Sequence, residues 1–252
     1  MMMRQMDMGK GYVDYVAEIG LVDFDPFEIE LEHPLVEKIR MEIEKREDRR
    51  QLRVRFFVSN VASFDEASRL TEEMVEQVLD KLSFVLLTPI QRARLDGGSI
   101  EVIKKDGSVE VRRMGTIRIE VDTLIEKRID SRSVRTELQS KDIPGSQYLK
   151  LFRFALQAPD MVTEFMFLYA ILLTIFDKQG EVDRFIRSIE PDVPYTPRPD
   201  KPRIKETIYT RLRNEVAHPN RPKVDLTKTR EEISKVLPKF IFIVKKAIER
   251  TS

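Results

Sequence analysis

Apolar and polar residues alternate along several short segments of the first 142 residues, and this alternation predicts strands of a half-buried sheet. The clearest case is 51–61, in which Leu52, Val54, Phe56 and Val58 occupy every second position. The segment 22–33 alternates in part, and further strands are predicted at 99–104, 108–113 and 116–122. An Asp-Gly pair at 106–107 suits a tight hairpin turn, so we expect a mostly antiparallel sheet.

Helical spacing interrupts these strands. Ser63 and Glu66 form a capping box, which satisfies free backbone N–H groups at the start of a helix. After it, apolar residues recur three and four positions apart, at Phe64, Ala67, Leu70, Met74, Val78 and Leu82. The same criterion predicts a charged helix over 37–50, because of the spacing of Val36, Ile39 and Ile43. Residues 1–20 show no clear period, and we expect them to be loosely held.

The pattern changes at 142–146, where Asp-Ile-Pro-Gly-Ser is typical of a domain boundary. From there no strand is predicted, and apolar periodicity indicates helices over 148–158, 160–178, 181–189, 203–217 and 229–249. The second of these contains a nearly apolar run, 166–176, which is typical of the buried helix of a bundle. The fourth has its apolar stripe at Ile204, Ile208, Leu212 and Val216, and the last opens with a second capping box at Thr229 and Glu232. The proline-rich segment 191–202 is expected to be extended and stiff.

These patterns predict an α+β protein in two domains. Residues 1–142 are expected to form a mixed α/β domain with a mostly antiparallel sheet, and residues 145–252 an all-α bundle of four or five helices. Charge divides in the same way. Residues 1–144 contain 24 Lys and Arg against 29 Asp and Glu, whereas residues 145–252 contain 20 against 14. The second half is therefore the better candidate for contact with an anionic partner.

The composition excludes several classes of site. There are no cysteines, which rules out disulfides, thiolate metal ligands and cysteine nucleophiles. The two histidines, His33 and His218, are too few for a histidine-based zinc site, so no metal or cofactor is expected. No stretch approaches the roughly 20 apolar residues that span a bilayer, and the N-terminus lacks an apolar core of the signal-peptide type. We expect a cytoplasmic protein that makes no membrane contact.

One short motif carries candidate chemistry. Near the end of the helix predicted over 203–217, the chain contains Arg213, Asn214 and, four residues later, His218, which Pro219 follows. Because proline disfavours helical geometry in the residue before it, we expect the helix to stop at His218. On a continuing helix Arg213 and His218 would lie about 140° apart, but a broken helix frees the imidazole to approach the guanidinium. The end of one helix is thus expected to present a cation, an amide and an imidazole.

The run Arg213-Asn214-x-x-x-His218 resembles the signature of the HEPN superfamily, whose members are small helical bundles with an Arg, four to six residues and then a His. The resemblance covers residues 145–252, and Arg211 also fits the spacing. It implies metal-independent ribonuclease activity and a homodimer formed through the helical domain. The order of the two domains, together with the run 82–89, is more distantly similar to MauJ-like proteins of methylamine-utilisation clusters.

The residue types fit such a reaction. Imidazole groups exchange protons near neutral pH and can take the proton of an RNA 2′-hydroxyl. A guanidinium stabilises the growing charge on phosphoryl oxygens through paired hydrogen bonds. We therefore interpret Arg213, Asn214 and His218 as candidate catalytic residues, with Asn214 orienting the phosphate or the imidazole. The candidate RNA-binding residues are the cations around them: Arg198, Lys201, Arg203, Arg211 and Arg221.

Other interpretations stay open. A second hypothesis is a module that binds RNA or a protein partner through a basic cleft without cutting it. In a purely structural interpretation, Arg213 and Asn214 cap the polar end of the bundle and His218 closes the helix. A third, based only on the similarity to MauJ-like proteins, is an accessory protein of unknown biochemical role. Asp160 and Glu164, four residues apart, are candidates for an ion pair with Arg213. Arg132 and Arg135 are candidate phosphate contacts, although exposed charges of this kind are common on protein surfaces.

Overall fold

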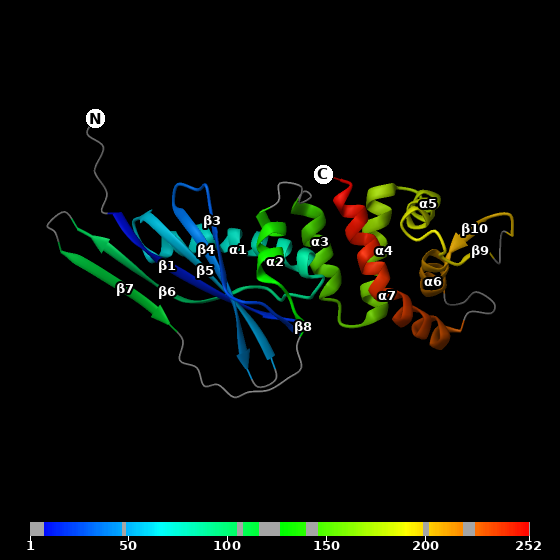
Figure 1. Ribbon diagram of the computed structural model, residues 1–252, viewed down its shortest axis with the longest axis horizontal. Helices are drawn as coiled ribbons and strands as arrows, with labels where there is room; N and C mark the ends of the chain where they lie inside the picture. Colours follow the sequence, from blue (N-terminus) through cyan, green and yellow to red (C-terminus); the bar gives the residue numbers. More distant parts are fainter. Residues whose placement is uncertain are drawn as a thin grey trace. The chain divides into compact units, whose positions relative to one another are not determined.

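The computed structural model describes residues 8–46, 49–104, 108–115, 127–139, 146–198, 202–218 and 225–251. The chain divides into two compact units, Met1–Lys141 and Asp142–Ser252. Long strands occur in the first unit and most of the helices in the second, so the protein is α+β (Figure 1).

A six-stranded antiparallel sheet forms the centre of the first unit. Its strands, in spatial order, are β3 (Phe27–Glu30), β4 (Val36–Arg46), β5 (Arg49–Val61), β1 (Met8–Ile19), β6 (Arg94–Ile103) and β7 (Val109–Gly115). Two short strands, β2 (Val22–Asp23) and β8 (Lys127–Arg128), form a separate parallel pair. The antiparallel pairing is therefore confirmed, while the turn at 106–107 and the strand predicted at 116–122 lie outside the described residues.

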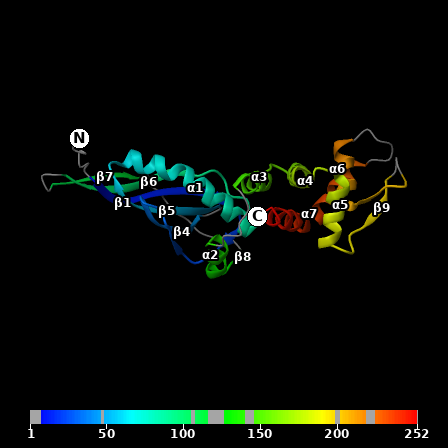
Figure 2. The ribbon, with the colours of Figure 1, turned by 90° about the horizontal axis from the view of Figure 1, so that it is seen from above.

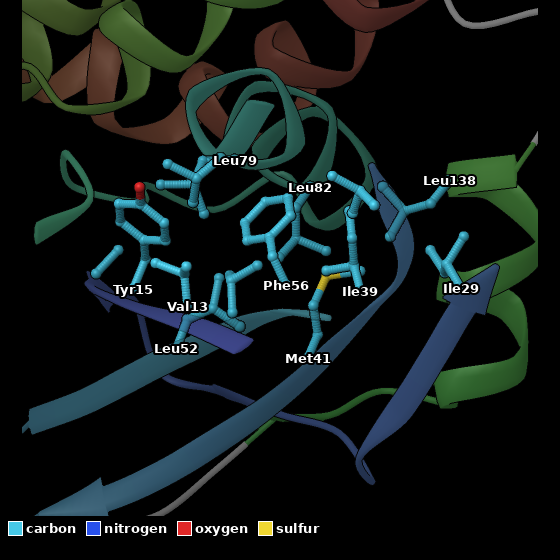
Figure 3. Packing of buried hydrophobic residues seen from close by; sticks show 14 of the residues in the cluster. Val13, Tyr15, Ile29, Ile39, Met41, Leu52, Phe56, Leu79, Leu82 and Leu138 are labelled. Atoms are coloured by element: carbon cyan, nitrogen blue, oxygen red, sulfur yellow. The ribbon is translucent and has the colours of Figure 1, made fainter. Parts of the chain in front are cut away.

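Helix α1 (Phe64–Leu86) lies along one face of this sheet (Figure 2), and α2 (Ser131–Gln139) follows β8. The predicted capping box is confirmed. The Ser63 hydroxyl accepts a hydrogen bond from the Glu66 N–H at 3.2 Å, and the Glu66 carboxylate accepts one from the Ala62 N–H at 2.6 Å. The apolar side of α1, including Leu79 and Leu82, packs on the inward residues of the strands to form a single core (Figure 3).

The helix expected over 37–50 is wrong, because this segment forms β4. A bulge shifts the register of β4 against β5 between Val36 and Lys38. Val36 and Ile39 consequently both face the core, although they are three residues apart. After the bulge the residues alternate, with Ile39 and Met41 buried and Arg40 between them exposed on the other face. The bulge therefore explains why two buried apolar residues of a strand have the spacing that is typical of a helix.

The expectation that residues 1–20 are loosely held is wrong for 8–19, which form β1 between β5 and β6. Two features interrupt the alternation of apolar and polar residues that would have predicted this strand. A side chain at Gly11 would place its Cβ 1.9 Å from the Ser99 carbonyl oxygen, so the close pairing there requires glycine. Asp14 is buried as well, because it is ion-paired with Arg55 at 2.7 Å and with Arg53 at 3.3 Å.

The described part of the second unit contains five helices around an aromatic core. They are α3 (Ser146–Leu156), α4 (Met161–Phe176), α5 (Gln179–Ile189), α6 (Ile208–Ala217) and α7 (Leu226–Glu249). The rings of Phe165, Tyr169 and Tyr209 surround that of Phe240, at centroid distances of 4.8 to 6.2 Å. None of the described helices has both the length and the apolar character needed to cross a membrane.

The second unit also contains strands, which the sequence did not indicate. Strands β9 (Tyr195–Pro197) and β10 (Lys205–Thr207) pair as a short antiparallel hairpin, so the expectation of an all-α unit is wrong in this respect. Residues 205–207, which were predicted to lie in the helix over 203–217, belong instead to this hairpin, and α6 begins only after Thr207. Ile204, counted in its apolar stripe, is instead exposed. Helix α7 begins three residues before Thr229, with Asp225 as its N-cap.

Candidate functional site at the end of helix α6

The candidate motif lies on the last turn of α6, a helix of ten residues. Thr207 caps its start by accepting a hydrogen bond from the Thr210 N–H at 3.4 Å. His218 caps its end with non-helical backbone angles (φ −134°, ψ 63°), and its N–H donates to the Asn214 carbonyl oxygen at 3.0 Å. The predicted stop of the helix at His218 is therefore confirmed.

Arg213 is half-buried, and its guanidinium contacts neutral groups of the described residues. Its Nη1 donates a hydrogen bond to Asn214 Oδ1 at 3.1 Å, and its Cζ lies 5.7 Å from the centre of the Tyr169 ring. No carboxylate of the described residues forms an ion pair with it. The guanidinium is thus held in place by neutral groups and keeps donors available for an anion.

Asn214 points into the protein rather than to solvent. Its side chain is buried, and its Nδ2 donates to Glu206 Oε2 at 2.9 Å while its Oδ1 accepts from Arg213. Glu206 is also buried, with Oε2 3.7 Å from the Nε of Arg198. The hydrogen bond from Arg213 to the Asn214 amide thus fixes the position of the guanidinium, and the hydrogen bond from Asn214 to Glu206 fixes the position of the amide.

His218 is exposed, and its imidazole contacts no hydrogen-bonding or charged partner among the described residues. His33, the other histidine, has a structural contact: its Nδ1 accepts a hydrogen bond from the Leu35 N–H at 3.2 Å.

The structure separates the five predicted RNA-binding cations into different groups. Arg211 is paired with Glu215 at 2.7 Å and with Glu232 on α7, so it joins two helices of the unit. Arg198 is paired with Glu206. Arg203 is exposed and has no ion pair with a described residue. The remaining two, Lys201 and Arg221, lie outside the described residues.

A buried polar network beneath the motif was not found from the sequence. Asp183 on α5 accepts hydrogen bonds from the Thr207 N–H at 3.0 Å, the Thr207 hydroxyl at 2.7 Å and the Thr210 hydroxyl at 2.6 Å. Tyr169 donates to Thr210 at 2.7 Å, and burial raises the pKa of its hydroxyl, which therefore stays protonated. This chain of bonds fixes the ring against which Arg213 lies.

The ion pair proposed between Arg213 and the start of α4 is not formed. The Asp160 carboxylate caps α4 instead, accepting hydrogen bonds from Val162 N–H at 2.9 Å and Thr163 N–H at 3.1 Å. Glu164 has no ion pair with a described residue, and burial raises its pKa to about 7.

A mostly apolar pocket of about 500 Å³ borders the last turn of α6. Val216, which lies between Arg213 and His218 in the chain, lines it together with Val162 of α4 and with Leu226 and Ile233 of α7. Arg230 supplies the charge at this pocket. An apolar group of a ligand would therefore find apolar walls here, and a negative charge on the same ligand would find one cation, Arg230.

Taken together, the end of α6 carries a half-buried guanidinium without an acidic partner among the described residues and, five residues later, an exposed imidazole. Within the ranges that the structure describes, no three His, Asp or Glu side chains converge to hold a metal ion.

No protein-family model, curated protein or solved structure matches this chain.

Proposed function

We propose that this protein binds RNA at the end of α6 and cleaves it without a metal ion, with Arg213 and His218 as the catalytic pair. The observation that carries this proposal is the contrast between neighbouring arginines on one helix. Arg211 forms ion pairs with two carboxylates, whereas Arg213, five residues before the exposed His218, has no acidic partner among the described residues. A guanidinium without an acidic partner and an exposed imidazole at the same helix end suit phosphoryl chemistry.

The reaction needs only groups of these types. The imidazole takes the proton of a ribose 2′-hydroxyl, and the 2′-oxygen attacks the adjacent phosphorus while the bond from phosphorus to the 5′-oxygen breaks. The products are a 2′,3′-cyclic phosphate and a 5′-hydroxyl that receives a proton from an imidazolium. Arg213 stabilises the extra negative charge on the phosphoryl oxygens as the new bond forms. The apolar pocket beside Val216 is suited to a nucleobase next to the scissile phosphate.

This proposal predicts that cleavage depends on His218. We expect the wild-type protein, in EDTA, to cut a pool of RNAs with single-stranded loops and to leave 2′,3′-cyclic phosphate ends. His218→Ala should reduce the rate about 10²–10⁴-fold, the usual contribution of general acid–base catalysis. Arg213→Ala should also reduce it, because the transition-state charge loses its partner. Products are measured by gel electrophoresis and mass spectrometry.

Matched variants give the controls. His33→Ala removes the other histidine and should leave cleavage unchanged, and Arg211→Lys should keep activity, since a lysine preserves the charge of a structural ion pair. Far-ultraviolet circular dichroism is the check that each variant is folded. Cleavage by His218→Ala at the wild-type rate would contradict the assignment.

A module that binds RNA without cutting it is the second candidate. The observation in its favour is that no described side chain orients the imidazole of His218, whereas catalytic bases are commonly held by a third group. In that case the wild type binds RNA but leaves it intact, Arg213→Ala weakens binding, and His218→Ala has little effect on affinity.

A further inference from the structure

A second concave site lies in the Met1–Lys141 unit, far along the chain from α6. It is a pocket of about 460 Å³ formed by β3, β4 and the first turns of α2. Three arginines line it, Arg40, Arg132 and Arg135, together with Pro26, Phe27 and Glu28. Its volume falls within the range of about 300–1,000 Å³ that is usual for small-molecule sites.

Core packing brings these separate segments together. Val134 and Leu138 of α2 belong to the same buried cluster as Phe27 of β3, which fixes α2 beside the edge strand. Residues 132 and 135 lie on the other, exposed side of α2. Glu28 of β3 and Arg40 of β4 are directly paired in the sheet register. The three guanidinium groups therefore share one pocket although 92 positions separate residues 40 and 132 in the sequence.

The charges around this pocket are not balanced. Among the described residues, Glu28 is the only carboxylate that lines the pocket, and Lys38 already binds it at 2.8 Å. Arg132 and Arg135 form no ion pair with any described carboxylate. The nearby Asp130 carboxylate caps α2 by accepting hydrogen bonds from the N–H and hydroxyl of Ser133, at 3.0 and 2.8 Å.

Arg40 also keeps donors available. Its Nε and Nη2 contact one oxygen of Glu42, each at 3.1 Å, which leaves Nη1 outside that pair. With three guanidinium groups against one carboxylate, the lining has a net charge of +2. Arginine is suited to phosphoryl oxygens because its planar donors bind two of them at once.

We propose that this pocket binds a phosphate monoester of about the size of a mononucleotide. A monoester carries close to two negative charges at neutral pH, which matches the lining, whereas each phosphodiester of a nucleic acid backbone carries one. Pro26 and Phe27 supply an apolar wall for the organic part of the ligand. This site is independent of the ribonuclease proposal.

Isothermal titration of the full-length protein tests this inference, with AMP as the probe. Adenosine, inorganic phosphate and a short RNA with hydroxyl groups at both ends are titrated in parallel. We expect AMP to bind the wild type, and adenosine to bind at least about 100-fold more weakly because it lacks the charge. The variant R132A/R135A should weaken AMP binding about 100-fold, at about tenfold for each lost charged contact.

One control shows that any loss belongs to this pocket. Arg69→Ala removes an exposed arginine of α1 in the same unit and should leave AMP affinity within about twofold. Absence of AMP binding to the wild type, or equal binding by R132A/R135A, would overturn the proposal. Inorganic phosphate or the hydroxyl-ended RNA binding as tightly as AMP, with the same loss of affinity in R132A/R135A, would overturn the assignment to a monoester.

Discussion

The neighbours of each side chain at the end of α6 decide what it can do. Arg213, Asn214 and His218 lie within six residues, yet the first is half-buried, the second is buried and the third is exposed. The amide of Asn214 is bonded to Arg213 and Glu206, so its geometry is that of a positioning residue for the guanidinium. The spacing of these residues in the sequence therefore does not indicate which of their side chains can contact a ligand.

Glu164 leads to a prediction at the same scale. Burial raises its pKa to about 7, above the ordinary value of about 4.5, so the folded protein holds a proton that the unfolded chain releases. The stability that this protonated carboxyl contributes is complete below about pH 4.5 and is lost as the pH rises through about 7. Glu164→Gln stays neutral at every pH, so its stability relative to the wild type should increase from pH 5 to pH 8.

Urea unfolding midpoints at pH 5, 6, 7 and 8 measure this difference. Glu181→Gln on α5 is the matched control, because that glutamate forms an ion pair in which both side chains are exposed, and its difference from the wild type should vary much less with pH. A constant difference between Glu164→Gln and the wild type across this range would contradict the prediction.

At the scale of elements, local irregularities determined where periodicity failed. The bulge in β4 gave Val36 and Ile39 a helical spacing, and the hairpin of β9 and β10 displaced the start of α6. Where the pattern was regular, as in β5 and α1, the predicted elements are confirmed. A single inserted residue changes which face the following residues occupy, and pairing with a neighbouring strand is what accommodates it.

Met41 distinguishes the strand from the helix that we expected there. In the apolar stripe of a helix it would lie off the buried face, whereas in β4 it is 1% exposed and lies in the core. Met41→Ala should therefore lower the free energy of unfolding by about 2–5 kcal/mol. Glu37→Ala, at an exposed ion pair of the same strand, should change it by less than about 0.5 kcal/mol. Chemical denaturation measures both, and equal effects would contradict the strand.

At the scale of the whole molecule, each unit has a hydrophobic core of its own. The cluster in the first unit runs from Val13 to Leu138, and the aromatic core around Phe240 belongs to the second. Both units have the usual length of an autonomous domain. The two candidate sites are likewise built within separate units, the pocket around Arg132 in the first and the motif around Arg213 in the second.

This organisation predicts that residues 142–252 fold when expressed alone. We expect a helical circular dichroism spectrum and one cooperative urea transition, with an unfolding free energy of about 5 kcal/mol or more. The fragment should also retain the RNA cleavage that we propose for the whole chain, with the same loss in His218→Ala. A fragment without a cooperative transition would show that its core needs the first unit.

Local physical chemistry was sufficient for part of this protein. Alternation in β5, the capping box of α1, the apolar run of α4 and the proline after His218 act through neighbouring residues, and the chain alone therefore predicted a sheet, its covering helix and the end of α6. Contacts between distant residues determined the rest. Pairing with β5 made β4 a strand, Asp183 and Glu206 fixed the surroundings of the motif, and core packing joined Arg40 to Arg132. Such contacts leave no local period, because each depends on how separate elements meet in three dimensions.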